Sequence, residues 1–175
     1  MQHVIQKFDA TITLKVQELS PAWRTHFRQM TLIGQPVFAL TVAGGVALYA
    51  EYMGLWQLML AAITVGMTAL FASALKFVLR RKRPATPYAA AMRLKTYSFP
   101  SGHAAATIAC YGLVAYLCFA AGGVLLSIAG ILVSLMIISI GVSRIYLGAH
   151  FPTDIIGGWI LGGIGLSIAT SMLYL

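Results

Sequence analysis

The stretch from Ser143 to Asp154 carries an arginine, a histidine and an aspartate between two uncharged apolar runs. Ionisable residues beside long apolar runs are energetically expensive, and by default they mark a working site. If the helix that contains Pro152 has begun by His150, Asp154 lies one turn further along the same face. Its carboxylate then accepts the proton-bearing nitrogen of the imidazole, and the other nitrogen is left as a nucleophile or base. The alternative is that Asp154 caps the start of that helix and His150 is an interfacial histidine.

Two further stretches contain residues with phosphate-binding chemistry. The first runs from Lys76 to Arg83 and a proline, at the end of an apolar run. The second is the Pro-Ser-Gly-His sequence at residues 100–103, at the start of another apolar run. Together with Arg144 and His150 they supply three cations, two histidines and a Ser-Gly turn. Such a set can bind a phosphate group and provide it with an acid and a base.

The spacings Lys-x6-Arg-Pro, Pro-Ser-Gly-His and Ser-Arg-x5-His-x3-Asp resemble the three motifs of the type 2 phosphatidic acid phosphatase family. The resemblance covers residues 76–154 by motif and the following helix by pattern. It implies that His150 is a nucleophile that forms a phosphohistidine, that Asp154 orients it, and that His103 is the general acid. The phosphate-binding residues that it implies are Lys76, Arg83, Ser101, Gly102 and Arg144.

Three fixed cations in a partly dry site match the negative charge that develops on the equatorial oxygens during phosphoryl transfer. The chain has only four acidic residues, and they offer no carboxylate cluster for magnesium. We therefore expect an enzyme that uses neither a metal nor another cofactor. Arg80, Arg81 and Lys82 match no catalytic position, and we expect them to anchor the chain at the membrane interface.

The composition is that of a membrane protein. Of the 175 residues, 59% are hydrophobic and 9% are charged, and the mean hydropathy is +0.85. A bundle of membrane helices needs such a composition, whereas a soluble core does not. A net charge of +8 on a soluble protein would suggest a nucleic acid partner. Here the cations adjoin apolar runs, so we expect the lipid bilayer and a phosphorylated membrane lipid as partners, and no nucleic acid.

Uncharged runs predict an all-α polytopic membrane helix bundle of about five crossings. Residues 29–50 and 52–75 each suffice for one crossing, and residues 96–143 suffice for two that are joined by a turn at Gly122-Gly123. The last crossing begins near Thr153. It contains Gly158 and Gly162 at the small-xxx-small spacing. We expect these glycines to pack within the bundle, with a homodimer through the last helix as the alternative.

Residues 1–31 form an amphipathic segment with apolar side chains at helical spacing. A Ser-Pro pair predicts the start of a second short helix, with Trp23, Phe27 and Met30 on its apolar side. We expect both helices to lie in the membrane interface, and His26 to be an interfacial polar residue. The bundle with the site then occupies residues 32–175, and the whole chain is one domain.

With five crossings, all three motifs lie on the side of the membrane that holds the N-terminus. All 12 Lys and Arg residues lie on that side as well. The positive-inside rule therefore predicts a site on the cytoplasmic face of the inner (plasma) membrane.

The sequence predicts a membrane lipid phosphatase that hydrolyses a phosphomonoester or diphosphate headgroup. A cytoplasmic site would meet phosphatidylglycerol phosphate and phosphatidic acid first. Two alternatives are a phosphatase for a polyprenyl (undecaprenyl) phosphate or diphosphate and a lipid phosphotransferase in which an alcohol replaces water. A non-catalytic carrier or receptor for anionic lipid would use the same cations, but it would not need His103, His150 and Asp154 together.

Overall fold

The structure is a computed structural model that describes residues 2–92 and 96–174. Every regular element in these residues is helical, which confirms the predicted fold class. Arg93 and Lys95, two of the cations counted above, lie outside the described residues. The elements are α1 (Gln2–Gln17), α2 (Trp23–Ile33), α3 (Pro36–Tyr52), α4 (Trp56–Leu79), α5 (Pro87–Ala90), α6 (Gly102–Ala106), the π-helical turn η1 (Thr107–Tyr111), α7 (Gly112–Ala121), α8 (Val124–Tyr146), α9 (Pro152–Ser171) and the 3-10 turn η2 (Met172–Tyr174).

Four spans are long and apolar enough to cross a membrane, namely Trp56–Leu79, Gly102–Ala121, Val124–Tyr146 and Pro152–Tyr174. The pair α2 and α3, which is bent by 48°, adds a fifth candidate span if the two helices are counted as one. The chain is therefore an integral membrane protein with four or five candidate crossings, a range that includes the predicted number of about five. The charge-free run over residues 29–50 is divided between two helices, because α2 ends at Ile33 and α3 begins at Pro36, which lacks an N–H and whose ring clashes with the carbonyl one turn earlier.

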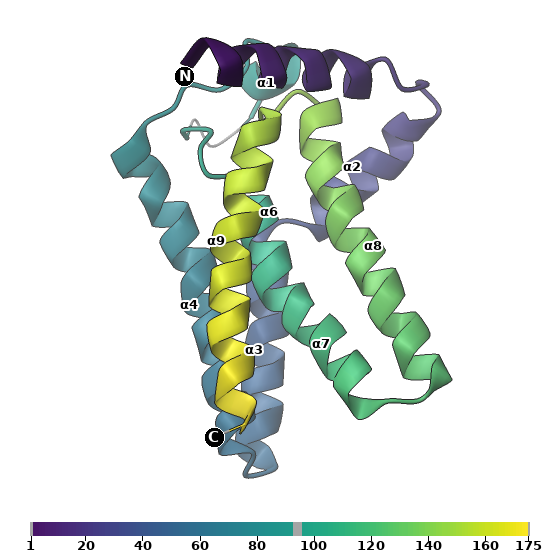
Figure 1. Ribbon diagram of the computed structural model, residues 1–175, viewed down its shortest axis with the longest axis vertical. Coiled ribbons are helices and arrows are strands. Elements are labelled where there is room, and N and C mark those ends of the chain that lie inside the picture. Colours follow the sequence, from purple (N-terminus) through teal and green to yellow (C-terminus); the bar gives the residue numbers. More distant parts are fainter. Residues whose placement is uncertain (1, 93–95, 175) are drawn as a thin grey trace.

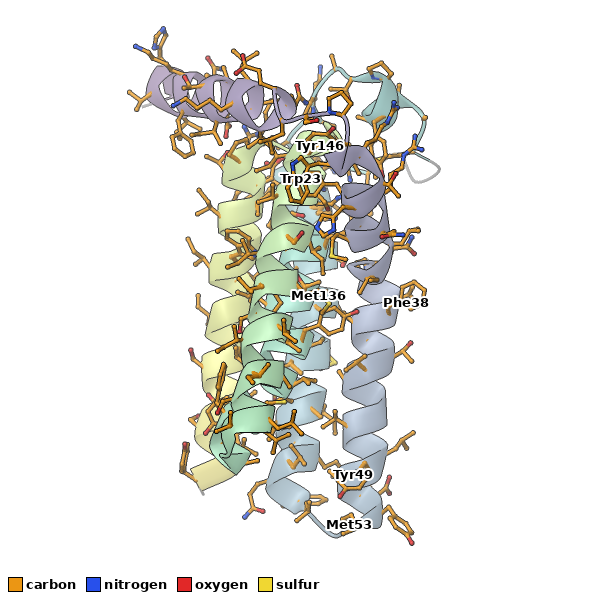
Figure 2. All side chains as sticks on the ribbon, turned by 90° about the vertical axis from the view of Figure 1, so that its right-hand side faces the viewer. Trp23, Phe38, Tyr49, Met53, Met136 and Tyr146 are labelled. Atoms are coloured by element: carbon orange, nitrogen blue, oxygen red, sulfur yellow. The ribbon has the colours of Figure 1, made fainter. Side chains whose placement is uncertain are left out.

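Helix α1 lies across one end of the bundle, and the C-terminus lies at the opposite end (Figure 1). The turns from α3 to α4 and from α7 to α8 are also at the far end. Side-chain nitrogens and oxygens gather at the α1 end, whereas the length of the bundle presents mostly carbon (Figure 2). The ends of α4 and α8 and the beginnings of α6 and α9 meet beneath α1, so the three motifs reach the same end.

Helix α2 packs against α8, although the sequence predicted an interfacial helix there. Phe27 is 5% exposed, and its ring centroid lies 4.7 Å from that of Tyr146. His26 was expected to be an interfacial polar residue, but its Nε2 is hydrogen-bonded to Ser139 Oγ at 2.8 Å. The bend of 48° between α2 and α3 accompanies this packing of α2 along α8.

Glycines allow α9 to approach α6 closely. A Cβ added to Gly158 would lie 2.7 Å from the carbonyl oxygen of Ser101, and one added to Gly162 would lie 2.5 Å from that of Ala105. The expected packing of these two glycines within the bundle is therefore confirmed. At the far end, Gly122 and Gly123 have φ angles of +72° and +84° and make the predicted turn.

Candidate active site

One cavity of about 610 Å³ brings together most of the predicted site residues. Its lining includes all three predicted phosphate-binding cations and both predicted catalytic histidines, which are Lys76, Arg83, His103, Arg144 and His150. These side chains come from α4, the following loop, α6, α8 and the segment before α9. The rest of the wall is largely apolar and includes Leu32, Val37 and Phe77. No acidic side chain lines this cavity in the part of the chain that the structure describes.

Arg83 is fixed at the cavity by four polar contacts. Its Nε donates to the carbonyl oxygen of Thr96 at 2.8 Å, and its Nη2 donates to Thr96 Oγ1 at 3.0 Å. Its Nη1 donates to the carbonyl oxygen of Ala149 at 2.9 Å and lies 3.2 Å from His150 Nε2. Burial lowers the pKa of the Arg83 guanidinium, and the positive charge of Arg144 lowers it further. Arginine keeps its charge at neutral pH despite such a shift.

Arg144 is a buried cation with one unused donor. Its Nη1 donates to Thr31 Oγ1 and, at 3.4 Å, to the hydroxyl of Tyr88. Its Nε is buried and has no hydrogen-bond partner among the described residues. Leaving a charged donor unpaired is costly, so this atom is available to donate a hydrogen bond to a water molecule or a ligand. Thr31 and Tyr88, which contact Arg144, were not among the predicted site residues.

Lys76 and the Ser-Gly turn meet at the beginning of α6. Lys76 is 9% exposed, and a Cβ added to Gly102 would lie 3.0 Å from its Nζ. Ser101 caps α6 by accepting the N–H of Ala104 at 3.4 Å, and its own N–H donates to the carbonyl oxygen of Asp154 at 2.9 Å. Ser101 is completely buried and is not part of the cavity lining, so the predicted phosphate contact of its hydroxyl remains a prediction.

His150 lies between Arg83 and Asp154. Its Nδ1 is 3.4 Å from Asp154 Oδ2, and its Nε2 faces Arg83 Nη1 at 3.2 Å. Because a guanidinium can only donate hydrogen bonds, Nε2 must be an acceptor, and the proton of the neutral ring is on Nδ1, toward Asp154. At 3.4 Å Nδ1 faces Asp154 but makes no hydrogen bond with a described residue, so the predicted hydrogen bond between the two side chains remains a prediction.

Asp154 is placed for both alternatives that the sequence left open, because it caps α9 and also lies beside His150. Helix α9 begins at Pro152, so His150 precedes the helix and is not on it, contrary to one of our expectations. Asp154 Oδ2 accepts the N–H of Phe151 at 2.9 Å and thus caps α9. The same oxygen faces His150. Capping and pairing are compatible because one carboxylate oxygen has two acceptor sites.

The surroundings of His150 favour the neutral imidazole. The residue is 1% exposed. Burial lowers the pKa of His150 well below the usual histidine value, and the positive charges of Arg144, Arg83 and Lys76 lower it further. A neutral ring with a free lone pair on Nε2 is the form that can act as a nucleophile or base.

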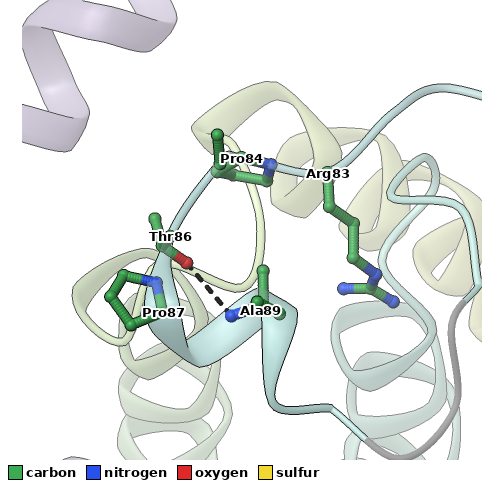
Figure 3. Close-up of a pocket in the computed structure, with 7 residues that line it drawn as sticks. Arg83, Pro84, Thr86, Pro87 and Ala89 are labelled. Atoms are coloured by element: carbon green, nitrogen blue, oxygen red, sulfur yellow. Dashed lines mark hydrogen bonds between the residues drawn. The ribbon is translucent and has the colours of Figure 1, made fainter.

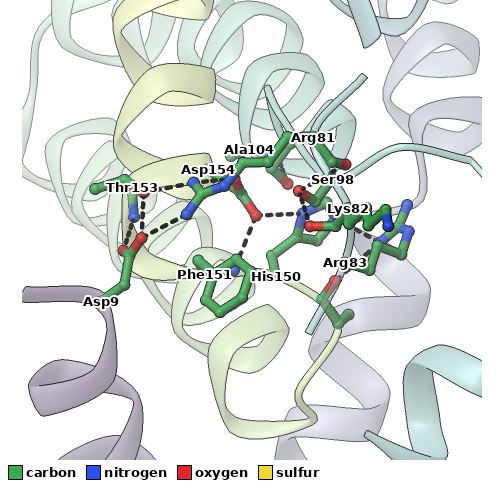
Figure 4. A network of polar contacts seen from close by, with 12 residues as sticks. Asp9, Arg81, Lys82, Arg83, Ser98, Ala104, His150, Phe151, Thr153 and Asp154 are labelled. Atoms are coloured by element: carbon green, nitrogen blue, oxygen red, sulfur yellow. Dashed lines mark hydrogen bonds and ion pairs between the residues drawn. The ribbon is translucent and has the colours of Figure 1, made fainter. Parts of the chain in front are cut away.

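Arg81 was predicted to be an interfacial anchor, and this expectation is wrong. Its Nη1 donates to Asp154 Oδ1 at 2.7 Å, and its Nη2 donates to Asp9 Oδ2 at 2.6 Å (Figure 4). Helix α4 ends at Leu79, and Arg80 adopts a left-handed conformation with φ of +50°. The chain therefore turns before Arg81, which points into the protein, whereas the side chains of Arg80 and Lys82 stay exposed.

Asp9 is the second functional candidate that sequence reasoning missed. It lies on α1 and is 2% exposed. Its Oδ1 accepts the N–H of Thr153 at 2.9 Å, and its Oδ2 accepts the Thr153 hydroxyl at 2.8 Å. A signal was present in the sequence, because Asp9 is a lone acid that shares a helix face with Ile12 and Val16.

The loop after α4 forms part of the rim. Thr86 caps α5 by accepting the N–H of Ala89 at 3.1 Å (Figure 3). Its hydroxyl donates to the carbonyl oxygen of Gly148 at 2.8 Å. A second recess of about 560 Å³ lies along this loop and shares Arg83 with the main cavity. The loop is thus attached to the segment that carries His150.

The PAP2 superfamily sequence profile matches residues 55–174, and the chain therefore belongs to the PAP2 superfamily. This confirms the family resemblance that the three motifs indicated. Among individual proteins, the chain is similar to phosphatidylglycerophosphatase B of Bacillus subtilis (strain 168), with 32% identity over 114 residues. That match covers 63% of this chain and 55% of the relative, so the chain aligns with little more than half of that protein.

Two solved structures have a similar fold. One is the crystal structure of a transmembrane PAP2-type phosphatidylglycerolphosphate phosphatase from Bacillus subtilis, with a TM-score of 0.79 and 25% identity. This match covers 96% of the present chain and 85% of that structure. The other is LpxE of Aquifex aeolicus, with a TM-score of 0.69 and 19% identity over 93% of this chain and 94% of that one. The second match shows the fold alone.

Proposed function

We propose that the protein is a membrane lipid phosphatase that works through a phosphohistidine on His150. The single observation that carries this proposal is the cavity in which three cations and two histidines meet without an acidic side chain among the described residues. Such a wall attracts an anion, and the unpaired Nε of Arg144 offers it a hydrogen bond. The apolar part of the wall suits the hydrocarbon next to a lipid headgroup.

The proposed reaction has two steps. In the first, the lone pair of His150 Nε2 forms a bond to phosphorus while the bond from phosphorus to the lipid oxygen breaks. The leaving oxygen takes a proton from protonated His103, and Asp154 stabilises the positive charge that develops on the His150 ring. In the second, a water molecule attacks phosphorus and gives a proton to His103. The N–P bond breaks, its electron pair returns to Nε2, and inorganic phosphate leaves.

The proposed reaction uses no metal. Asp9 and Asp154 have their carboxylate oxygens occupied by Arg81, by backbone N–H groups and by the Thr153 hydroxyl. The side chains of Glu18 and Glu51 are exposed. The cations of the cavity can neutralise the transferring phosphoryl group, which is the task that magnesium performs in many phosphoryl-transfer enzymes.

Phosphatidylglycerol phosphate is the first substrate to test, and phosphatidic acid is the second. The names of the Bacillus subtilis relatives support the first choice. A non-catalytic lipid-binding protein has less support, because cations alone suffice to bind an anionic lipid. The pairing of Asp154 with His150 at 3.4 Å would have no purpose in such a protein.

The proposal is tested by phosphate release from phosphatidylglycerol phosphate in detergent, with a metal chelator present throughout. We expect turnover by the wild-type protein and none by His150→Ala. His3→Ala is the matched control, because His3 is an exposed histidine on α1, away from the cavity. Turnover by folded His150→Ala would refute the nucleophile, and turnover that depends on added magnesium would refute the metal-free reaction.

We further propose that the site faces the cytoplasm. The described Lys and Arg residues lie on α1, α2, the ends of α4 and α8 and the loop after α4, all at the end that α1 covers (Figure 1). The positive-inside rule assigns that end to the cytoplasm. Single cysteines at Ala85 and at Tyr174 test this in intact cells. An impermeant thiol reagent should label the cysteine at position 174 and spare the one at position 85, and the opposite pattern would reverse the orientation.

A further inference from the structure

Helix α1 reaches the proposed catalytic pair through two side chains that the reaction above does not use. We propose that Asp9 and Arg81 are positioning residues, which hold the Asp154 carboxylate against His150 and set the charge that this histidine experiences. The proposal rests on the proposed function of His150. It makes the amphipathic N-terminal helix a part of the active-site assembly, although no family motif lies on that helix.

The geometry fixes Asp154 from two directions. Its Oδ1 accepts Arg81 Nη1 at 2.7 Å, while its Oδ2 accepts the Phe151 N–H at 2.9 Å and faces His150 Nδ1 at 3.4 Å. The carboxylate therefore cannot rotate without losing a charge-assisted hydrogen bond. Asp154 is completely buried, so water cannot replace a lost partner.

Arg81 is fixed in turn by Asp9. Arg81 Nη2 donates to Asp9 Oδ2 at 2.6 Å, and Arg81 Nη1 donates to Thr153 Oγ1 at 2.7 Å. The guanidinium also lies over the ring of Phe151, 4.6 Å from its centroid. Asp9 itself is held by the N–H and hydroxyl of Thr153, in the first turn of α9. The chain of contacts thus runs from α1 through the segment after α4 to the start of α9 (Figure 4).

The three side chains of Asp9, Arg81 and Asp154, called the relay below, carry a net negative charge. Two carboxylates and one guanidinium sum to −1 on the Nδ1 side of the ring, and Asp9 and Asp154 are both almost completely buried. Charges interact strongly where water is excluded, so each member of the relay contributes to the potential at His150. Other charged or titratable groups that face this histidine are the cations of the cavity and the second histidine, namely Lys76 on α4, Arg83 in the loop, His103 on α6 and Arg144 on α8. The neighbouring helix α2 contributes Thr31, which is uncharged.

Opposite changes in this relay should move the titration of His150 in opposite directions. In Asp9→Asn the relay loses a negative charge, so the protonated ring is less stable and its pKa falls. In Arg81→Gln the relay loses its positive charge, so the pKa rises. The double variant Asp9→Asn/Arg81→Gln restores the wild-type charge of −1, and its pKa should lie between those of the single variants.

The test is the pH dependence of kcat/KM for phosphatidylglycerol phosphate, because its acid limb reports the group that must be neutral in the free enzyme. We expect the limb to move by about half a pH unit or more toward lower pH in Asp9→Asn and toward higher pH in Arg81→Gln. In Asp9→Asn we also expect kcat to fall between about 10- and 100-fold, with a smaller change in KM, because the carboxylate is misplaced. The ionisation of the substrate is the same for every variant, so differences between the limbs belong to the protein.

Glu18→Gln is the matched control, because it removes a negative charge at the exposed end of the same helical segment. It should leave both the limb and kcat unchanged. Asp9→Glu keeps the charge and should keep the wild-type limb even where kcat falls. If Asp9 only attaches α1 to the bundle, folded variants would lose activity without opposite shifts of the limb, and the relay would be refuted.

Failure of this inference can be distinguished from failure of the proposed function. If His150→Ala abolishes turnover but the limbs of all relay variants coincide, His150 is the nucleophile and the relay is refuted. If His150→Ala retains turnover, the proposed function itself fails. Where Arg81→Gln does not fold, the shift of Asp9→Asn relative to Asp9→Glu decides the question.

Discussion

His150 lies between two regions that differ in their balance of positive and negative side chains. On its Nδ1 side, Asp9 and Asp154 share Arg81, and their oxygens are occupied by donors of the protein itself. On its Nε2 side, Lys76, Arg83 and Arg144 face a cavity whose described lining contains no carboxylate. The carboxylates of the first region are paired within the protein, whereas the second region has an excess of positive charge and a buried donor, Arg144 Nε, with no hydrogen-bond partner among the described residues.

This difference assigns separate tasks to the two regions. Uncompensated cations in a partly buried cavity gain most when an anion enters, so the Nε2 side is suited to bind phosphate. A compensated pair of carboxylates gains little from a ligand, and in the proposed reaction it would orient the ring and stabilise the charge that develops there. Two arginines that are two residues apart contact opposite regions. Arg81 donates to the carboxylate of Asp154, whereas Arg83 points to the cavity.

The largest expected effect comes from changing the cavity side without changing its charge. Arg83→Lys keeps a cation, but a single ammonium cannot reproduce the contacts of Arg83 with Thr96, Ala149 and His150. We expect kcat/KM to fall between about 100- and 1,000-fold, as for the loss of a donor that stabilises transition-state charge. The measurement is steady-state phosphate release in detergent.

The neighbouring exposed cation provides the matched control for this variant. Lys82→Gln removes a full charge one residue away, and the side chain of Lys82 is exposed. If the fixed geometry of Arg83 matters, Lys82→Gln should stay within about threefold of the wild type, because exposed charges are screened by salt. Equal losses in the two variants would mean that the rim attracts substrate by charge alone.

A smaller effect should appear in the pH profile of the wild-type protein. Burial, with the cations Arg144, Arg83 and Lys76, lowers the pKa of His150, so its imidazole stays neutral below the usual value of about 6.5. We expect the acid limb of kcat/KM to lie below pH 6.5 after correction for the substrate, whose own pKa is measured separately by phosphorus NMR. A limb at or above pH 6.5 would contradict the described surroundings of His150.

The lowered pKa of His150 also makes the free energy of unfolding depend on pH, in a direction that can be stated. A group whose pKa is lower in the folded than in the unfolded protein makes the unfolded state bind more protons between the two pKa values. The contribution of neutral His150 is therefore fully present above about pH 6.5 and is lost as the pH falls toward the folded-state pKa. Thermal unfolding followed across this range should show a smaller decrease for His150→Gln than for the wild type.

The cations and histidines that line the cavity could be predicted from the sequence, whereas Asp9, Arg81 and Thr31, which support them, could not. Lys76, Arg83, His103 and Arg144 stand at fixed spacings within short motifs, next to runs that predict the spans. The spans in turn predict that the motifs reach one end of the bundle. Spacing along the chain is thus enough to identify charged and titratable groups that line one cavity.

The supporting contacts depend on distances that no local pattern contains. Asp9 meets Thr153 across most of the chain, and Thr31 meets Arg144 where α2, bent by 48° relative to α3, packs against α8. A charge-free run predicts where a membrane crossing lies, but it does not show whether the helix is bent. Arg81 shares a cluster of cations with exposed neighbours, and its burial follows from the turn at Arg80, which hydropathy does not reveal.

The central claim is that His150 carries the phosphoryl group, and trapping that intermediate tests it most directly. Nitrophenyl phosphate that is radiolabelled at phosphorus is mixed with His103→Ala, because this leaving group needs no proton while the later attack by water requires a base. We predict that label accumulates on His150, with the acid lability and base stability of a phosphohistidine, and that His103→Ala/His150→Ala carries none. Turnover by the wild-type protein with no label on His150 in His103→Ala, or equal label in the double variant, would contradict the account.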